Sequence, residues 1–129
     1  MNNKLSIYVK LITLITLIRL KCKCYVSIRD IPSTPLGGTV VIYCDLTNEV
    51  LNNLIWRRSD YNGTNILNIL PTNIPARYSL LSTQTNYSYA LSTLTISGVQ
   101  EDDFALFECS SGNYDKKNLT ELSNYIILI

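Results

Sequence analysis

Hydrophobic and polar residues alternate in short runs along most of the chain, which is the pattern of strands with one buried face. In "GTVVIYC" (38–44) the alternation puts Val40, Ile42 and Cys44 on one face. In "YALSTLTI" (89–96) it does the same for Leu94 and Ile96. Further strands are expected in "NLIWR" (53–57), "NILNIL" (65–70), "ARYSLL" (76–81), "FALFECS" (104–110) and "ELSNYIILI" (121–129). A polar turn is expected at "STQTN" (82–86) and a helical turn at "SGVQEDD" (97–103). Many short strands predict an all-β sandwich with two antiparallel sheets.

The N-terminal segment has the pattern of a secretory signal peptide. Lys4 and Lys10 precede "LITLITLI" (11–18), an apolar run much shorter than the ~20 residues that span a bilayer. An amphipathic tail is the other interpretation of this segment. We expect residues 1–24 to be removed and residues 25–129 to form a single domain.

The four cysteines are consistent with export. Cleavage after Cys24 would leave Cys44 and Cys109 as an even pair that can close on itself. Earlier cleavage would leave Cys24 free to link two chains. Metal binding by Cys22 and Cys24 is the third possibility, with neither a histidine nor a second Cys-x-Cys pair to support it.

The composition excludes several classes of chemistry. The chain has 129 residues, no histidine and a net charge of +1, so His-dependent catalysis, most zinc sites and strong attraction to nucleic acid are not expected. The acidic run 101–103 has no further oxygen ligands spaced to complete a metal site. In a strand Arg57 and Arg58 face opposite ways, so we expect them to be a solvated pair beside Trp56 and not a phosphate site. We therefore predict neither an enzyme nor a cofactor or metal protein.

The segment "DFALFEC" (103–109) resembles the Asp-x-Ala-x-Tyr-x-Cys motif of immunoglobulin variable-type domains. Cys44, Trp56 and Cys109 also follow in the order and at intervals similar to those of that family, and "PARYS" (75–79) resembles the start of its strand D. The resemblance covers roughly residues 38–110. It implies a variable-type β-sandwich with a Greek-key arrangement of strands.

The resemblance also implies particular contacts. Cys44 and Cys109 would form the disulfide between the sheets, and closing this loop of 65 residues would contribute about 4 kcal/mol in the chain-entropy model. Arg77 would form an ion pair with Asp103 at the base of the sandwich. The predicted core residues are Trp56, Leu94, Ile96, Val99 and Phe107.

Two features depart from antibody domains. Phe107 stands where the family has tyrosine, so a hydroxyl hydrogen bond worth about 1 kcal/mol is missing. The expected last strand, "LSNYIILI" (122–129), lacks the Phe-Gly-x-Gly motif through which antibody domains pair. Antibody-like pairing is therefore not expected, and the protein is predicted to be a monomer or a weak homodimer.

The resemblance implies a binding face on the G-F-C-C′ sheet. Its predicted residues are Ile55, Arg57, Leu106 and Glu108, with Ile66, Leu67 and Ile69 as additions from strand C′ and a tip loop at 112–117. Ile55 and Leu106 beside the charge pair predict an apolar centre with a polar rim, which is typical of an interface, although scattered surface apolar residues are common in any protein.

Three N-glycosylation sequons begin at Asn62, Asn86 and Asn118, each in or beside a predicted turn. The chain is rich in Asn, Ser and Thr, so two or three sequons would arise by chance and their number is no evidence. Their use depends on export.

Because no stalk, membrane span or lipid-anchor signal follows the predicted domain, we expect a secreted binding protein. As a lone variable-type domain rich in Asn, Ile, Lys and Tyr, the chain is similar to the immunoglobulin-domain proteins of poxviruses and other large DNA viruses. This resemblance implies a viral receptor mimic or decoy that binds a host immune protein. The alternatives are a fragment or soluble isoform of a host immune or adhesion receptor, and a self-associating virion or surface protein.

Overall fold

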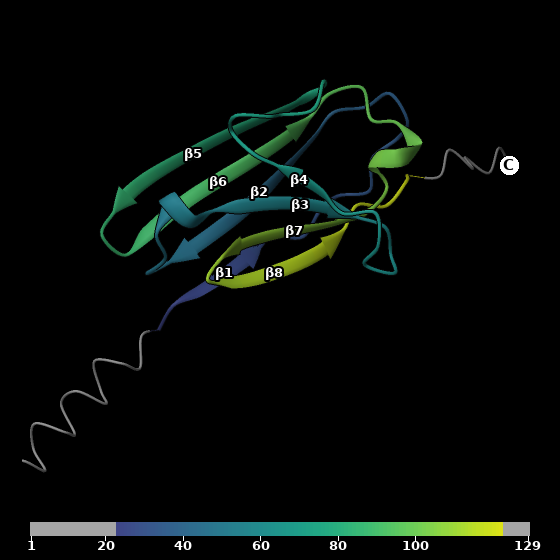
Figure 1. The fold of residues 1–129 in the computed structure, drawn as a ribbon. Coiled ribbons are helices and arrows are strands. Elements are labelled where there is room, and N and C mark those ends of the chain that lie inside the picture. Colours follow the sequence, from purple (N-terminus) through teal and green to yellow (C-terminus); the bar gives the residue numbers. More distant parts are fainter. Residues whose placement is uncertain (1–22, 123–129) are drawn as a thin grey trace, which may run out of the picture.

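The computed structural model describes residues 23–122, and its strands form two antiparallel sheets that pack face to face (Figure 1). One sheet has the strand order β1-β2-β6-β5 and the other the order β4-β3-β7-β8. The strands are β1 (Tyr25–Ile28), β2 (Val40–Thr47), β3 (Ile55–Ser59), β4 (Leu67–Ile69), β5 (Tyr78–Asn86), β6 (Tyr89–Ile96), β7 (Leu106–Ser111) and β8 (Asn113–Asn118). Two 3₁₀ turns, η1 (Leu51–Asn53) and η2 (Glu101–Asp103), lie at opposite ends of the sandwich, here called the η1 end and the η2 end (Figure 1).

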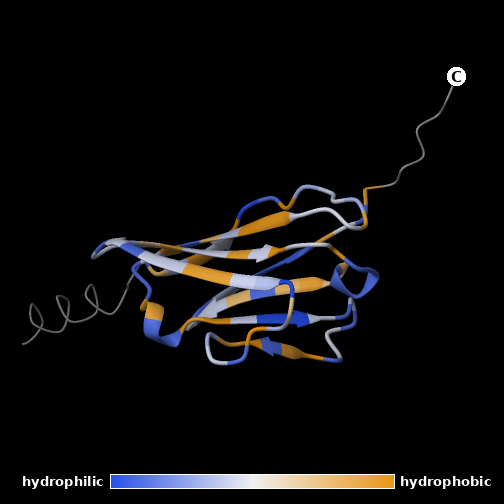
Figure 2. Ribbon diagram, turned by 90° about the horizontal axis from the view of Figure 1, so that it is seen from above, coloured by the Kyte–Doolittle hydropathy of each residue, from blue (hydrophilic) through white to orange (hydrophobic). Residues whose placement is uncertain are grey.

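Strict alternation of buried and outward residues explains why β2 and β6 form the centre of the first sheet. Val40, Ile42 and Cys44 are buried, and so are Leu94 and Ile96 on the facing strand, whereas the residues between them point outward. Figure 2 shows the same alternation of hydrophobic and polar positions along the strands. Because a slip of one residue would turn the whole apolar set to solvent, this pattern determines the register of the two strands.

The two sheets are joined by a disulfide between Cys44 and Cys109, whose Cα atoms are 6.5 Å apart. Trp56 lies opposite Cys109 in the β3–β7 register, and its indole Nε1–H donates a buried hydrogen bond of 2.9 Å to Ser92 Oγ. The polar atom of this large core residue is therefore satisfied inside the sandwich. The described part of the chain is an immunoglobulin-like β-sandwich, and the predicted disulfide and all-β fold are confirmed.

The sandwich is closed on one lateral side and open on the other. On the closed side β1 packs against β8, where Ile28 N–H donates to Asp115 Oδ2 at 2.7 Å and Lys117 pairs with Asp30 at 2.8 Å. Further along this side, Thr34 forms a parallel bridge with Glu121. On the other side β4 and β5 are the terminal strands of their sheets, and neither has a further strand beyond it among residues 23–122.

Two predictions about local structure need correction, and one element was not predicted. The segment 82–86 continues β5 instead of turning, and the hairpin to β6 follows it. The outer neighbour of β7 is β8 (Asn113–Asn118), which takes up most of the predicted tip loop (112–117). Residues 123–129 of the predicted last strand lie outside the described residues. The η1 turn was not predicted, whereas the helical turn expected within residues 97–103 is η2.

Most of the predicted signal peptide (residues 1–24), with Cys22, also lies outside the described residues. Cys24 is disulfide-bonded in the structure. The first strand begins at the next residue, Tyr25.

Candidate binding face

The outward surface of the β4-β3-β7-β8 sheet, here called the β3–β7 face, carries the predicted binding residues. Because Trp56, Phe107 and Cys109 point into the core, their neighbours Arg57 and Glu108 point outward. Register pairing then places Ile55 opposite Ser110 and Ser59 opposite Leu106. All four predicted residues of this face (Ile55, Arg57, Leu106 and Glu108) lie on this surface, and all are half-buried.

A row of polar side chains crosses the middle of the face. Arg57 is opposite Asn68 on one side and opposite Glu108 on the other, and Glu108 is opposite Lys116. The guanidinium of Arg57 donates from Nη1 to Glu108 Oε2 at 3.0 Å and from Nε to Asn68 Oδ1 at 3.2 Å. The side chain of Arg57 is 36% exposed and that of Glu108 is 16% exposed, so the ion pair is accessible from solvent.

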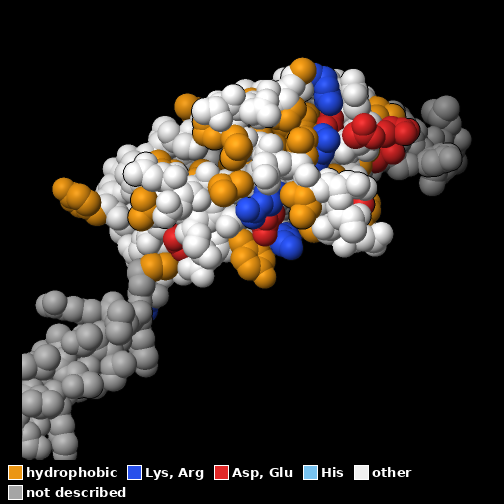
Figure 3. All heavy atoms as spheres, in the orientation of Figure 1, with side chains coloured by type: hydrophobic (Ala, Val, Ile, Leu, Met, Phe, Trp, Pro, Cys, Tyr) orange, Lys and Arg blue, Asp and Glu red, His pale blue; other side chains and the backbone are white. Residues whose placement is uncertain are grey.

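Apolar side chains surround this row, so the predicted apolar centre with a polar rim is wrong and the charge pair lies at the centre. Tyr114 and Ile66 are more than half exposed, at 63% and 61%, and Ile55 and Leu106 are half-buried. Lys116 Nζ lies 5.5 Å from the centre of the Tyr114 ring, within reach of a cation–π contact. Figure 3 shows basic and acidic side chains in contact near the middle of the visible surface, with hydrophobic side chains around them.

The contribution of β4 differs from the prediction. Ile69 is only 1% exposed and lies in the core, because it is paired with the inward-facing Trp56. Leu67 has the same strand parity and is half-buried, opposite Arg58. The outward residue of β4 is Asn68, and the exposed Ile66 precedes the strand.

The predicted tip loop is replaced by a tight hairpin. Gly112 is the only residue between the paired Ser111 and Asn113, and its φ of +90° is one that side-chain-bearing residues rarely adopt. As a result Tyr114 and Lys116 are presented on a strand of the β3–β7 face. The sequence contains a signal for this hairpin in the "SGN" turn, which lies within the predicted tip loop.

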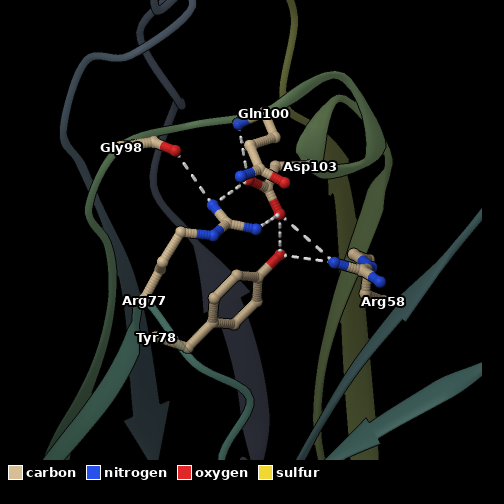
Figure 4. Close-up of polar contacts among 6 residues, drawn as sticks. All are labelled: Arg58, Arg77, Tyr78, Gly98, Gln100 and Asp103. Atoms are coloured by element: carbon tan, nitrogen blue, oxygen red, sulfur yellow. Dashed lines mark hydrogen bonds and ion pairs between the residues drawn. The ribbon is translucent and has the colours of Figure 1, made fainter.

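A second group of charges lies inside the sandwich at the η2 end, here called the Asp103 cluster (Figure 4). Asp103 is fully buried, and its Oδ2 accepts from Arg77 Nη1 at 2.6 Å, as the resemblance implies. Its Oδ1 accepts from Arg58 Nη1 at 3.2 Å and from the hydroxyl of Tyr78. The main-chain N–H of Gln100 donates to Oδ2 at 2.8 Å. The buried carboxylate is therefore paired and fully hydrogen-bonded.

The sequence interpretation missed Arg58 and Tyr78. Arg58 was expected to be solvated, but it has the strand parity of Trp56 and so points toward the inner layer. Tyr78 begins β5, and its hydroxyl is buried near the η2 end, where it donates to Asp103. Phe107, the buried aromatic residue of β7, has no hydroxyl. Arg77 itself has a φ of +74°, an uncommon backbone conformation for a residue with a side chain, and its Nη1 also donates to Gly98 O at 3.0 Å.

The Asp103 cluster shifts the protonation of its members. Burial acts to raise the pKa of Asp103, but hydrogen bonds from Arg77, Gln100 N–H and Tyr78 outweigh it and hold that pKa below its ordinary value. Burial and the bond to Asp103 raise the pKa of Tyr78, so its hydroxyl remains a donor at any physiological pH. The cluster has a carboxylate held in its charged form, which is suited to structural pairing rather than to proton transfer.

The sequons occupy both ends of the molecule, and all three asparagines are exposed. Asn62 lies in the β3–β4 connection, and Asn118 ends β8, so both are at the η2 end. Asn118 is thus far from the β7–β8 turn, beside which it was expected. Asn86 ends β5 at the η1 end, where its Oδ1 accepts from Ser88 N–H at 2.9 Å. Glycosylation of these residues stays a prediction.

No model of a known protein family matches the chain. Within residues 23–122, no group of three or more acidic or cysteine side chains is placed to hold a metal ion. The helical segments of that same part are all too short to cross a bilayer.

Proposed function

We propose that this chain is an exported immunoglobulin-like binding protein of the variable type, which acts as a viral mimic or decoy by engaging a host immune protein through the β3–β7 face. The observation that carries the proposal is the arrangement of this face: the ion pair of Arg57 and Glu108 lies at its centre, and apolar side chains surround it. Charged groups give an interface its specificity and register. Arg57 and the exposed Tyr114 are also of the residue types that most often contribute a large share of the binding free energy.

The type of fold supports a variable-type assignment. The strand β4 lies beside β3, which is one strand more than the seven of a constant-type domain. This strand widens the β4-β3-β7-β8 sheet, and it supplies Asn68 to the polar row. The extra width therefore enlarges the surface on which a protein partner can bind.

Two further observations support export. The disulfide between Cys44 and Cys109 is of the kind that persists in oxidising compartments. The asparagines of the three sequons are all exposed.

The test is a binding assay with the full chain secreted from eukaryotic cells and applied to a panel of immune cells and a library of cell-surface receptors. We expect binding that Arg57→Glu abolishes, because the change leaves two acidic side chains facing each other at the centre of the face. Leu106→Arg should weaken binding by placing a charge in the apolar surround. Both variants should keep the melting temperature close to that of the unmodified chain.

Arg29→Glu is the matched control. Arg29 also forms an exposed ion pair, with Asp45 at 2.8 Å, but lies next to β1 in the other sheet. We expect this variant to bind like the unmodified chain. Equal binding by all three variants would contradict the assignment of the face, and failure to bind any immune protein would contradict the proposed function.

A further inference from the structure

The strand β5 has an unpaired main-chain edge. It is the last strand of its sheet, and among the described elements it pairs only with β6. Ser97 N–H donates to Arg77 O at 2.8 Å just before the strand, so these two residues form a hydrogen-bonded pair. Along an antiparallel ladder, hydrogen-bonded pairs alternate with pairs whose main-chain groups point away from each other. The main-chain groups of β5 that point away from β6 therefore belong to Leu80, Ser82 and Gln84.

This edge lacks the features that usually prevent pairing with another chain. Edge strands are commonly protected by charged residues, by proline, by shortness or by a covering segment. Over its nine residues β5 contains neither a charged residue nor a proline. By contrast, the edge strand β4 has only three residues, and β1 is covered by β8.

An apolar groove runs beside the same edge. Near the middle of β5, between the two sheets, is a hollow of about 320 Å³. Its lining residues are Leu51, Leu54, Trp56, Ile69, Pro71, Ile74, Leu80 and Ser82. A second hollow, of about 760 Å³, shares Leu51 with it and continues to the η1 end, where it includes the fully exposed Tyr87. A strand added to β5 would cover this groove.

We propose that the occupant of this edge is the β5 strand of a second copy of the chain, paired antiparallel about a two-fold axis at Ser82. In this register Leu80 of one copy faces Gln84 of the other, and Leu81, which is 65% exposed, faces Thr83. A two-fold axis brings each residue close to its own counterpart, so charged side chains at the centre of such an edge would repel. The uncharged β5 meets this requirement, which is the reason for choosing a second copy over an unrelated peptide.

The sequon at the end of β5 bears on the same edge. Asn86 lines the larger hollow, so a glycan attached there would occupy the groove that the second copy needs. The dimer therefore forms when Asn86 carries no glycan. The inference does not depend on the proposed function, because the β3–β7 face lies on a different side of the molecule.

The experiment measures the mass of the full chain carrying Asn86→Gln by light scattering and sedimentation over a concentration series. The expected result is a dimer that dissociates on dilution. In a dimer of Leu81→Lys, the new lysine of one copy would lie diagonally across the two-fold axis from the new lysine of the other. Because the two ammonium groups repel, the affinity of the dimer should fall roughly tenfold or more. Because Leu81 is exposed, the melting temperature of the monomer should change little.

Ser27→Lys is the matched control, since Ser27 is an exposed residue on β1, the opposite terminal strand of the same sheet. It should leave the dimer intact. Hydrogen exchange should also slow at the amides of Leu80, Ser82 and Gln84 as concentration rises. A monomer at all concentrations, equal effects of the two lysine variants, or a dimer that persists in detergent until reductant is added would each overturn the proposal.

Discussion

Arg57 and Arg58 are neighbours in the sequence, yet they belong to two regions with opposite roles. Arg58 reaches inward to Asp103, a carboxylate with no exposure to solvent. Arg57 reaches outward to Glu108, and its side chain remains 36% exposed. Both are ion pairs near 3 Å, at 3.2 Å and 3.0 Å respectively, so their distances do not distinguish them.

The difference lies in what surrounds each pair. The carboxylate of Asp103 has no contact with water, so its hydrogen bonds all come from the donors of the cluster. Removing this carboxylate would leave those donors without an acceptor. Glu108 keeps contact with water, which can replace a lost partner at little cost. An exposed pair is thus free to exchange its partner for one on another protein, whereas the buried pair is committed to the fold.

The largest effect is expected from Asp103→Ala. The change leaves Arg58, Arg77 and Tyr78 without their shared acceptor, and we expect a loss of about 3–5 kcal/mol in the free energy of unfolding. Urea denaturation followed by tryptophan fluorescence would measure it. Glu108→Ala is the control from the outer pair and should cost less than about 1 kcal/mol. Equal losses in the two variants would remove the distinction between the regions.

A smaller contrast is expected between the two arginines. Arg58→Ala should cost about 2 kcal/mol, because it removes charge-assisted hydrogen bonds to Asp103 and Tyr78 while Arg77 remains. Arg57→Ala should cost less than about 1 kcal/mol but should weaken partner binding. Denaturation and binding measured on the same two preparations give the comparison. It would be contradicted by an Arg58 variant as stable as the unmodified chain.

The smallest effect is expected from acid. The pKa of Asp103 is lower in the folded chain than its ordinary value of about 4, so its stabilising contribution is complete above that range and is lost as pH falls through the folded pKa. The loss should be smaller than in Asp103→Ala, because a protonated carboxyl still forms hydrogen bonds. Stability measured between pH 6 and pH 2 should decline less steeply in Asp103→Asn. A decline of equal slope would assign the acid sensitivity to other carboxylates such as Asp45, whose pKa is also lowered, chiefly by the hydrogen bond from Arg29.

Much of the inner layer could be predicted because strand alternation is a local property. The parity of Val40, Ile42 and Cys44 predicted which side of β2 is buried, and the structure agrees. The same parity places Arg58, two residues after Trp56, on the inner side, in contrast to the solvated position that its charge suggests. Its buried partner makes the inward position stable.

The errors concern segments whose conformation depends on distant neighbours. The polar residues 82–86 suggested a turn, but pairing with β6 extends them as a strand. Ile69 was placed outside because no local feature distinguishes the two faces of a three-residue strand, and its pairing with Trp56 decides the matter. Residues 113–118 are polar enough to suggest a loop, and their register with β7 makes them a strand.

By itself, the sequence determined the all-β class and the central strands, because alternation is contained in short stretches of chain, and its resemblance to variable-type domains implied the cysteine pair and the ion pair between Arg77 and Asp103. Only the tertiary structure decided that Arg58 and Tyr78 share Asp103, that β8 presents Tyr114 and Lys116 beside Glu108, and that β5 remains an open edge. Those features arise from contacts between residues far apart in the chain, and the burial that selects them exists only once both sheets have packed.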